Sequence, residues 1–308
     1  MHARTPIPQV LADPSTPAPV RDRLALVADV RAFATKLGLE VGNQYTSYAP
    51  WPGDRIVTTL VATRPGEIEP HEFWFPLVGD VPYKGYFDED RAEQDARKME
   101  AEGFATCLSA VPAYSTLGWF EDPVTGPMLR GEEQELVETL IHELVHRTVY
   151  ARNAAAFNEG LATFLGQEGM IQFYEAREGS AGPAAARARA LGADDRALTA
   201  CLESLRGKVE SLYRTESAGP ERDAARAALE VDARAAIAEL PLTTQDSRAL
   251  ARELPLGDAC LALEGTYTRD LSRYAEALRH AGDLQALIRR AKQAAGTADP
   301  QQALWDTR

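Results

Sequence analysis

The sequence contains few residues that can build covalent cross-links or thiolate metal sites. Its 308 residues include three cysteines and five histidines. None of Cys107, Cys201 and Cys260 lies in a Cys-x-x-Cys pair, which excludes a zinc-thiolate site and a disulfide framework. A single bridge between Cys201 and Cys260 is the pairing that this spacing leaves open. The sequence therefore predicts at most one disulfide.

Long apolar runs and positive charge are also scarce. No uninterrupted apolar stretch reaches membrane-spanning length, and the first ten residues, MHARTPIPQV, lack the apolar core of a signal peptide. The formal net charge of −13 disfavours a nucleic-acid partner, because neutralising phosphates requires a basic surface. We expect a soluble chain as given, with no transmembrane segment; its oligomeric state and its compartment stay open.

The rest of the composition is that of a globular protein, with 45% apolar and 26% charged residues. Apolar periodicity and the positions of Gly and Pro predict an α+β fold in two domains, residues 1–165 and 166–308. The second domain is rich in Ala, Arg, Leu and Glu and is expected to be all-helical. The expected elements are a proline-rich extended arm (5–19), a helix (20–36), strands (54–63, 71–78 and 104–114), a surface helix (88–103), and a long antiparallel helical pair (194–214 and 220–239).

The segment IHELVHRTVYARNAAAFNEGLATF, residues 141–164, carries the strongest chemical signal. Residues four apart on a helix share a face, so His142 and His146 point the same way and can bind one cation. Glu143 lies on the flank of that face, where its carboxylate can reach a water molecule held by the metal. Apolar residues at helical spacing predict that this helix continues to a C-terminal cap at Asn153.

A catalytic zinc with one open coordination position needs a third protein ligand. Glu159 is the candidate, at the opening of a second helix with the sequence NEGLATFL. The helix advances about 1.5 Å per residue, and the residues before Glu159 can span the return distance if they are extended. We therefore expect one Zn²⁺ per chain, bound by His142, His146 and Glu159.

These segments resemble the gluzincin metallopeptidases, and more closely a bacterial family described as putative aminopeptidases. The likeness spans most of the chain and is carried by PIPQVLADPSTPAPVRDRL, FPLVGDVPYKGYFDED, VPAYSTLGWFEDPV, HELVH and FNEGLATF. It implies a zincin-like fold, a peptide substrate, Glu143 as general base and the three zinc ligands named above. It also implies a periplasmic or membrane-anchored lipoprotein, with a cytoplasmic protein as the alternative. The 12 residues between His146 and Glu159 are fewer than in well-studied gluzincins.

An oxyanion in the reaction needs a hydrogen-bond donor besides zinc. Tyr114 and Tyr267 are the candidate catalytic donors, and Tyr86 competes with them. Tyr114 and Ser115 are also candidate substrate-binding residues, because related enzymes run an edge strand there that pairs with the substrate backbone. A half-buried structural tyrosine is the alternative for each.

Other functions remain open. The same site could hydrolyse a non-peptide amide, or the protein could be a non-catalytic zinc-binding scaffold. A scaffold is disfavoured because structural zinc has four protein ligands, and three are found. Aminopeptidase specificity rests on the resemblance alone, since AYSTLG contains no carboxylate to bind a free amino terminus. We expect a cleft between strand 104–114 and the helices after residue 166, restricted to short peptides.

Overall fold

The computed structural model describes residues 4–76, 79–111 and 121–306. Internal contacts group the chain into two compact units. Unit 1 consists of Met1–Val57, Ala110–Ala185 and Asp270–Arg308, and unit 2 consists of Thr58–Ser109 and Ala186–Arg269. The two predicted domains are divided by a change in amino-acid composition, whereas these units are defined by contacts. The predicted boundary at residue 165 falls inside a helix of unit 1. The division into residues 1–165 and 166–308 therefore stays a prediction.

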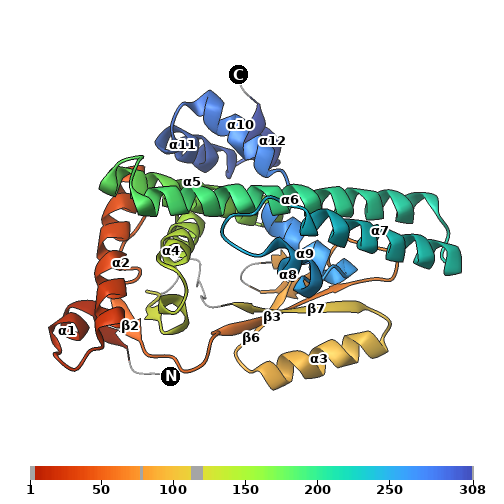
Figure 1. The fold of residues 1–308 in the computed structure, drawn as a ribbon, viewed down its shortest axis with the longest axis horizontal. Helices are drawn as coiled ribbons and strands as arrows, with labels where there is room; N and C mark the ends of the chain where they lie inside the picture. Colours follow the sequence, from red (N-terminus) through yellow and green to blue (C-terminus); the bar gives the residue numbers. More distant parts are fainter. Residues whose placement is uncertain (1–3, 77–78, 112–120, 307–308) are drawn as a thin grey trace. The chain divides into compact units, whose positions relative to one another are not determined.

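Unit 1 combines several helices with a small three-stranded sheet (Figure 1). The sheet has the order β1-β2-β8, with β1 antiparallel and β8 parallel to β2. Helix α2 packs on α4, α4 packs on α5, and α10 packs on α5. The elements are β1 (Thr5–Pro6), α1 (Ile7–Ala12), α2 (Ala18–Leu37), β2 (Ser47–Ala49), β8 (Val124–Thr125), the 3₁₀ turn η1 (Pro127–Leu129), α4 (Glu133–Thr148), α5 (Ala155–Glu178), α10 (Leu271–Ala281), α11 (Leu284–Ala294) and α12 (Pro300–Trp305).

The proline-rich N-terminal segment is not an extended arm throughout, so that prediction is wrong in part. Residues 7–12 form α1, with a proline in the first turn. A proline is tolerated there because the first amide groups of a helix have no intrahelical acceptor. The predicted helix over residues 20–36 is confirmed as α2, which ends at Gly38 in the left-handed conformation (φ 87°).

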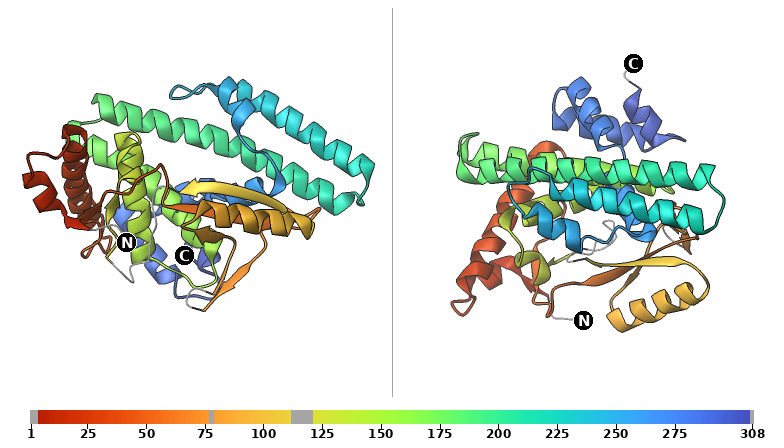
Figure 2. Two further views of the ribbon diagram at one scale, coloured as in Figure 1. Left: turned by 90° about the horizontal axis from the view of Figure 1, so that it is seen from below. Right: turned by 45° about the vertical axis from the view of Figure 1, so that its right-hand side comes forward.

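Unit 2 contains a second three-stranded sheet, of order β6-β3-β7, and a hairpin of β4 and β5 (Figure 2). Strand β3 pairs antiparallel with β6, and α3 packs beside β6. Some elements of unit 2 begin or end just outside its bounds. The elements are β3 (Val57–Thr63), β4 (Phe73–Phe75), β5 (Gly79–Val81), β6 (Lys84–Tyr86), α3 (Glu89–Ala101), β7 (Ala105–Val111), α6 (Pro183–Thr215), α7 (Pro220–Ala238), α8 (Ser247–Glu253) and α9 (Asp258–Thr268).

Most predicted elements of unit 2 are confirmed. The strands expected at 54–63 and 104–114 are β3 and β7 over their described residues, and the surface helix is α3. The strand expected at 71–78 is shorter, because the chain turns after Phe75 into the β4-β5 hairpin. The helical pair is confirmed as α6 and α7, which lie side by side in Figure 1. The two helices share one apolar cluster, which contains Leu202, Leu205, Val209, Ala233 and Ile237.

The disulfide joins a different pair of cysteines from the one that the sequence left open. Cys107 on β7 is bonded to Cys260 on α9, with Cα atoms 5.1 Å apart. Cys201 is a free thiol, half-buried on α6 and packed against the apolar cluster of that unit. The predicted pairing of Cys201 with Cys260 is therefore wrong. The two bonded residues lie 153 positions apart, so only the packing of α9 near β7 brings them together.

The α+β class is confirmed: small sheets are combined with a predominantly helical chain. Over the described ranges, we find no helix that combines the length and the hydrophobicity needed to cross a lipid bilayer.

Candidate metal centre

Helix α4 carries the histidines and forms for local reasons. Its buried residues Leu136, Leu140 and Leu144 recur at helical spacing. A capping box between Glu132 and Glu135 satisfies the first amide groups. The helix ends at Thr148, because Val149 is extended (φ −135°, ψ 113°), so the predicted cap at Asn153 is wrong. Asn153 instead takes a left-handed conformation (φ 58°) in the connection to α5.

The side chain of Asn158 holds this connection in place. Its Oδ1 accepts a hydrogen bond from the backbone amide of Ala151 and its Nδ2 donates to the carbonyl of the same residue, both at 2.8 Å. Asn158 is buried, so these bonds are shielded from water and replace a backbone ladder. Helix α5 begins at Ala155, and Glu159 lies one turn inside it instead of opening it.

The packing of α5 on α4 is close because α5 contains glycines at the contact. A Cβ atom at Gly166 would lie 3.2 Å from the carbonyl oxygen of Glu138, and one at Gly169 would lie 3.0 Å from the Ile141 side chain. Glu159 contacts His146, whereas Gly166, seven positions later on α5, contacts Glu138 and His142, which come earlier on α4. The two helices therefore run antiparallel. Their separation determines how far the Glu159 carboxylate reaches toward α4.

The structure brings together the three predicted metal ligands. The Nε2 atoms of His142 and His146 are 3.1 Å apart. The Oε2 atom of Glu159 lies 3.4 Å from the first of these nitrogens and 3.2 Å from the second. The three side chains are 17%, 6% and 10% exposed, respectively. Together they form a group of donor atoms that could hold a metal ion.

The electrostatics of the cluster favour a charged pair of Glu159 and His146. Burial acts to lower the pKa of His146, but the charge and hydrogen bond of Glu159 outweigh it and raise that pKa to about 9. Burial acts in the opposite direction on Glu159, yet the two imidazoles bring its pKa well below the usual range. At neutral pH Glu159 is therefore ionised and His146 holds a proton, which a metal cation must displace.

Glu143 lies beside the ligands and is not one of them. Its side chain is half-buried, and its Oε2 atom is buried without a hydrogen-bond partner in the described part of the chain. A buried carboxylate oxygen without a partner is unusual in a folded protein and marks a position for a polar group. This arrangement leaves Glu143 able to accept a proton.

For the predicted tyrosines and Ser115, the predicted roles are not tested, so those roles stay predictions. Tyr114 and Ser115 lie outside the described residues. Tyr267 is half-buried on α9 of unit 2. The Tyr86 hydroxyl donates a hydrogen bond to the carboxylate of Asp95 in unit 2, which gives this hydroxyl a structural partner.

Two other tyrosines of unit 1 were not predicted. Burial and the charge of Glu159 raise the pKa of Tyr150, which follows α4 and is 38% exposed. Its position four residues after His146 in the sequence could have indicated it, although α4 ends before it. Burial, then the charges of Glu143 and Asp122, raise the pKa of Tyr45 well above its ordinary value. No sequence signal connects Tyr45 to the motif.

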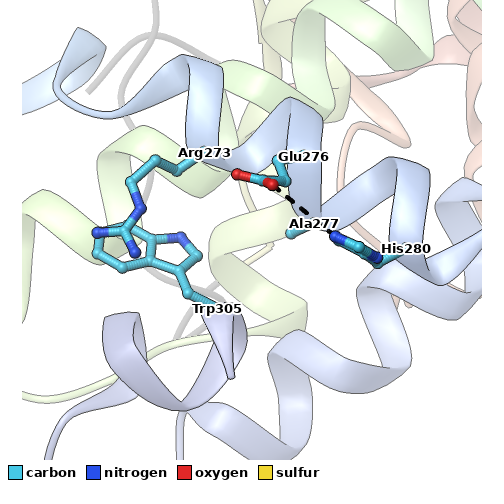
Figure 3. A pocket seen from close by; sticks show the side chains of 5 residues that line it. All are labelled: Arg273, Glu276, Ala277, His280 and Trp305. Atoms are coloured by element: carbon cyan, nitrogen blue, oxygen red, sulfur yellow. Dashed lines mark ion pairs between the residues drawn. The ribbon is translucent and has the colours of Figure 1, made fainter. Parts of the chain in front are cut away.

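A small pocket of about 120 Å³ lies elsewhere in unit 1, between α10 and α12 (Figure 3). Its lining includes Arg273, whose guanidinium carbon lies 3.6 Å from the ring centroid of Trp305. It also includes Glu276 and His280, which form an ion pair at 3.8 Å. None of the candidate metal ligands lines it, and Nε1 of Trp305 has no hydrogen-bond partner in the described part of the chain.

The chain matches a family described as "Putative aminopeptidase" over residues 1–304. No curated protein and no solved structure matches it.

Proposed function

The chain belongs to the putative aminopeptidase family, and from that premise we propose that it is a zinc-dependent peptidase of the gluzincin type. In this proposal His142, His146 and Glu159 bind one Zn²⁺ and Glu143 is the general base. The family membership supports a peptide substrate. The cluster of donor atoms supports the metal.

The observation that carries the proposal is the spacing of the three donor atoms. Tetrahedral zinc with bonds of about 2.0–2.1 Å requires donor atoms about 3.3 Å from one another. The three distances in the cluster are 3.1, 3.4 and 3.2 Å. Two imidazole nitrogens and one carboxylate oxygen are also the ligand set of catalytic zinc sites with one open position. The residues present therefore fit this ion.

A bound zinc would supply a Lewis acid that polarises the substrate carbonyl and lowers the pKa of a water molecule beside it. Glu143 accepts the proton of the attacking water through its carboxylate, whose Oε2 has no competing partner among the described residues. It then returns the proton to the nitrogen of the leaving amine. Since Glu143 is half-buried, little bulk water competes for this proton transfer.

The donor to the developing oxyanion is a separate part of the proposal. Tyr114 and Tyr267 stay the proposed catalytic donors, and Tyr114 with Ser115 the proposed substrate-binding residues. Tyr150 joins them, because this residue is partly exposed and the charge of Glu159 acts on it.

The test combines metal analysis with a peptide library read by mass spectrometry on the same purified sample. We expect close to one zinc per chain and cleavage of library peptides, both lost after chelation and restored by zinc. Zinc binding without peptide turnover would favour a hydrolase of non-peptide amides or a zinc-binding scaffold. His146→Ala is the matched variant and should lose zinc and turnover together.

The aminopeptidase part is tested with two peptides of one sequence, one with a free amino terminus and one acetylated. An aminopeptidase releases the first residue of the free peptide and leaves the acetylated one intact. Cleavage of both at equal rates would contradict exopeptidase specificity and leave the zinc peptidase unaffected.

A further inference from the structure

The loop that connects α2 to β2 runs along the C-terminal half of α4. The backbone amide of Glu40 donates a hydrogen bond to Oγ1 of Thr148 at 2.8 Å. Two residues later, a Cβ atom at Gly42 would lie 2.8 Å from the guanidinium of Arg147. Arg147 lies one helical turn after Glu143, on the same side of the helix. The loop therefore advances along α4 toward the proposed general base.

Tyr45, at the end of this loop, has a backbone conformation that bulky residues rarely adopt. Its φ angle is +58°, in the left-handed region where a side chain crowds the backbone. Its amide donates to the carbonyl of Asp122 at 2.8 Å, and the amide of Asp122 donates to Oε1 of Gln44 at 2.7 Å. Such conformations persist only where the surroundings impose them, and they concentrate at functional sites.

Helix α2 fixes the loop from the other side. Arg31 donates from Nε to the carbonyl of Gln44 at 2.8 Å and from Nη2 to the carbonyl of Gly42 at 2.9 Å. Tyr45 is thus held between α2 and the residues before β8, with its side chain 3% exposed.

The Tyr45 hydroxyl has no hydrogen bond within the described part of the chain. A tyrosine buried to this extent usually has a partner for its hydroxyl. Oε2 of Glu143 also lacks a partner there, and its charge acts on Tyr45. Burial and this charge together keep the hydroxyl protonated, so it remains a donor. The contact of the preceding loop with Arg147 and the charge of Glu143 on Tyr45 therefore indicate a donor near an acceptor that has no partner among the described residues.

We propose that Tyr45 is a positioning residue for Glu143, whose carboxylate its hydroxyl holds by donating a hydrogen bond to Oε2 during turnover. The other carboxylate oxygen is then directed at the attacking water. Catalytic hydrogen bonds are often long in the free enzyme and shorten when substrate binds. This inference rests on the proposed function, because Glu143 needs orienting only if it acts as a base.

The test is Tyr45→Phe, which removes the hydroxyl and keeps the ring and the backbone conformation. We expect kcat to fall about 10- to 100-fold, with KM within about twofold of wild type and the zinc content and melting temperature unchanged. A residue that only supports the fold would change stability or zinc content and would not lower kcat alone. Tyr48→Phe, the same change three residues along, is the matched control and should keep wild-type kcat.

Glu143→Gln supplies the second arm. In that background Tyr45→Phe should cause no further loss of residual turnover, because there is no longer a base to orient. Additive losses, a wild-type kcat in Tyr45→Phe, or loss of fold or zinc in that variant would each overturn the proposal. A zinc-loaded wild-type protein that cleaves no peptide would instead overturn the proposed function, and this inference with it.

Discussion

At the scale of single residues, the two glutamates of the centre have different surroundings and different proposed roles. Glu159 is almost fully buried between two imidazoles, which stabilise its ionised form. Glu143 is half-buried, and its Oε2 lacks a partner in the described part of the chain. Neutralising each carboxylate should therefore have different consequences for metal binding.

Glu143→Gln should keep zinc and fold and lose at least about 100-fold in kcat, because an amide cannot accept the water proton. Glu159→Gln should weaken zinc binding, because the anionic ligand is replaced by a neutral one. The measurements are zinc content after dialysis against a graded chelator series and turnover at saturating zinc. Equal loss of zinc in both variants would require the two roles to be reassigned.

At the scale of elements, the contact between α4 and α5 sets the position of the third ligand. The two histidines are fixed by one helix, but Glu159 comes from another. Gly166 and Gly169 allow the two backbones to approach closely, and Asn158 holds the connecting residues. The metal site thus depends on helix packing as well as on the ligands.

Gly166→Ala should therefore weaken zinc binding and lower the free energy of unfolding by about 1–3 kcal/mol. Its Cβ would lie 3.2 Å from a backbone oxygen of α4, which cannot move without separating the helices. Gly207→Ala on α6 is the control, since a Cβ there would have nothing within 4 Å. It should be neutral or stabilising by about 0.5–1 kcal/mol. Denaturant unfolding and chelator competition measure both, and equal behaviour of the two variants would contradict this packing argument.

Asp194 of α6 provides an element-scale test that depends on pH. It is buried, and its carboxylate accepts hydrogen bonds from the amides and hydroxyls of Thr243 and Thr244. Burial acts to raise its pKa, but these bonds outweigh it and lower the pKa below the ordinary value. A lowered folded-state pKa means that the stabilisation is present above about pH 4 and is lost as the pH falls through the folded-state value.

Asp194→Asn should accordingly destabilise the protein by about 1–3 kcal/mol at neutral pH. The NH2 group of the asparagine side chain is a donor and cannot accept the hydrogen bonds that the backbone amides of Thr243 and Thr244 donate to Asp194. The difference from wild type should shrink as the pH falls from about 5 to 2. Denaturant unfolding across this range measures it. A difference that stays constant would show that the carboxylate charge is not what stabilises this contact.

At the scale of the whole molecule, two compact units are each formed from segments distant in sequence. All three metal ligands and Glu143 belong to unit 1, whereas the disulfide belongs to unit 2. Loss of the bridge should therefore leave the ligands of the metal in place.

Thiol titration in denaturant should detect one thiol per chain before reduction, Cys201, and three after it. Removing a native disulfide typically costs about 2–5 kcal/mol, so Cys107→Ser should lower the free energy of unfolding while zinc content stays unchanged. Cys201→Ser is the control and should keep the bridge. Disulfides persist in oxidising compartments, so the titration requires protein that has been expressed in such a compartment. Three free thiols in such material would contradict the bridge.

The sequence by itself determined the parts of this protein that depend on neighbouring residues. The spacing of His142 and His146 places two ligands on one helical face whatever surrounds them, because helix geometry is local. The same reasoning found α2, α3, β3, β7 and the pair α6 and α7. Composition likewise indicated a globular protein, and apolar periodicity with the positions of Gly and Pro indicated the α+β class.

Only the tertiary structure decided the features that depend on distant segments. The end of α4 at Thr148 is one, and the hydrogen bonds from Asn158 to Ala151 across the following turn are another. The Cys107–Cys260 bridge and the contact of the loop before Tyr45 with Arg147 and Thr148 of α4 are further examples. Periodicity records which face of an element is buried, but not which other element covers it. Pairing between distant segments is determined by how those faces pack, and no local pattern encodes it.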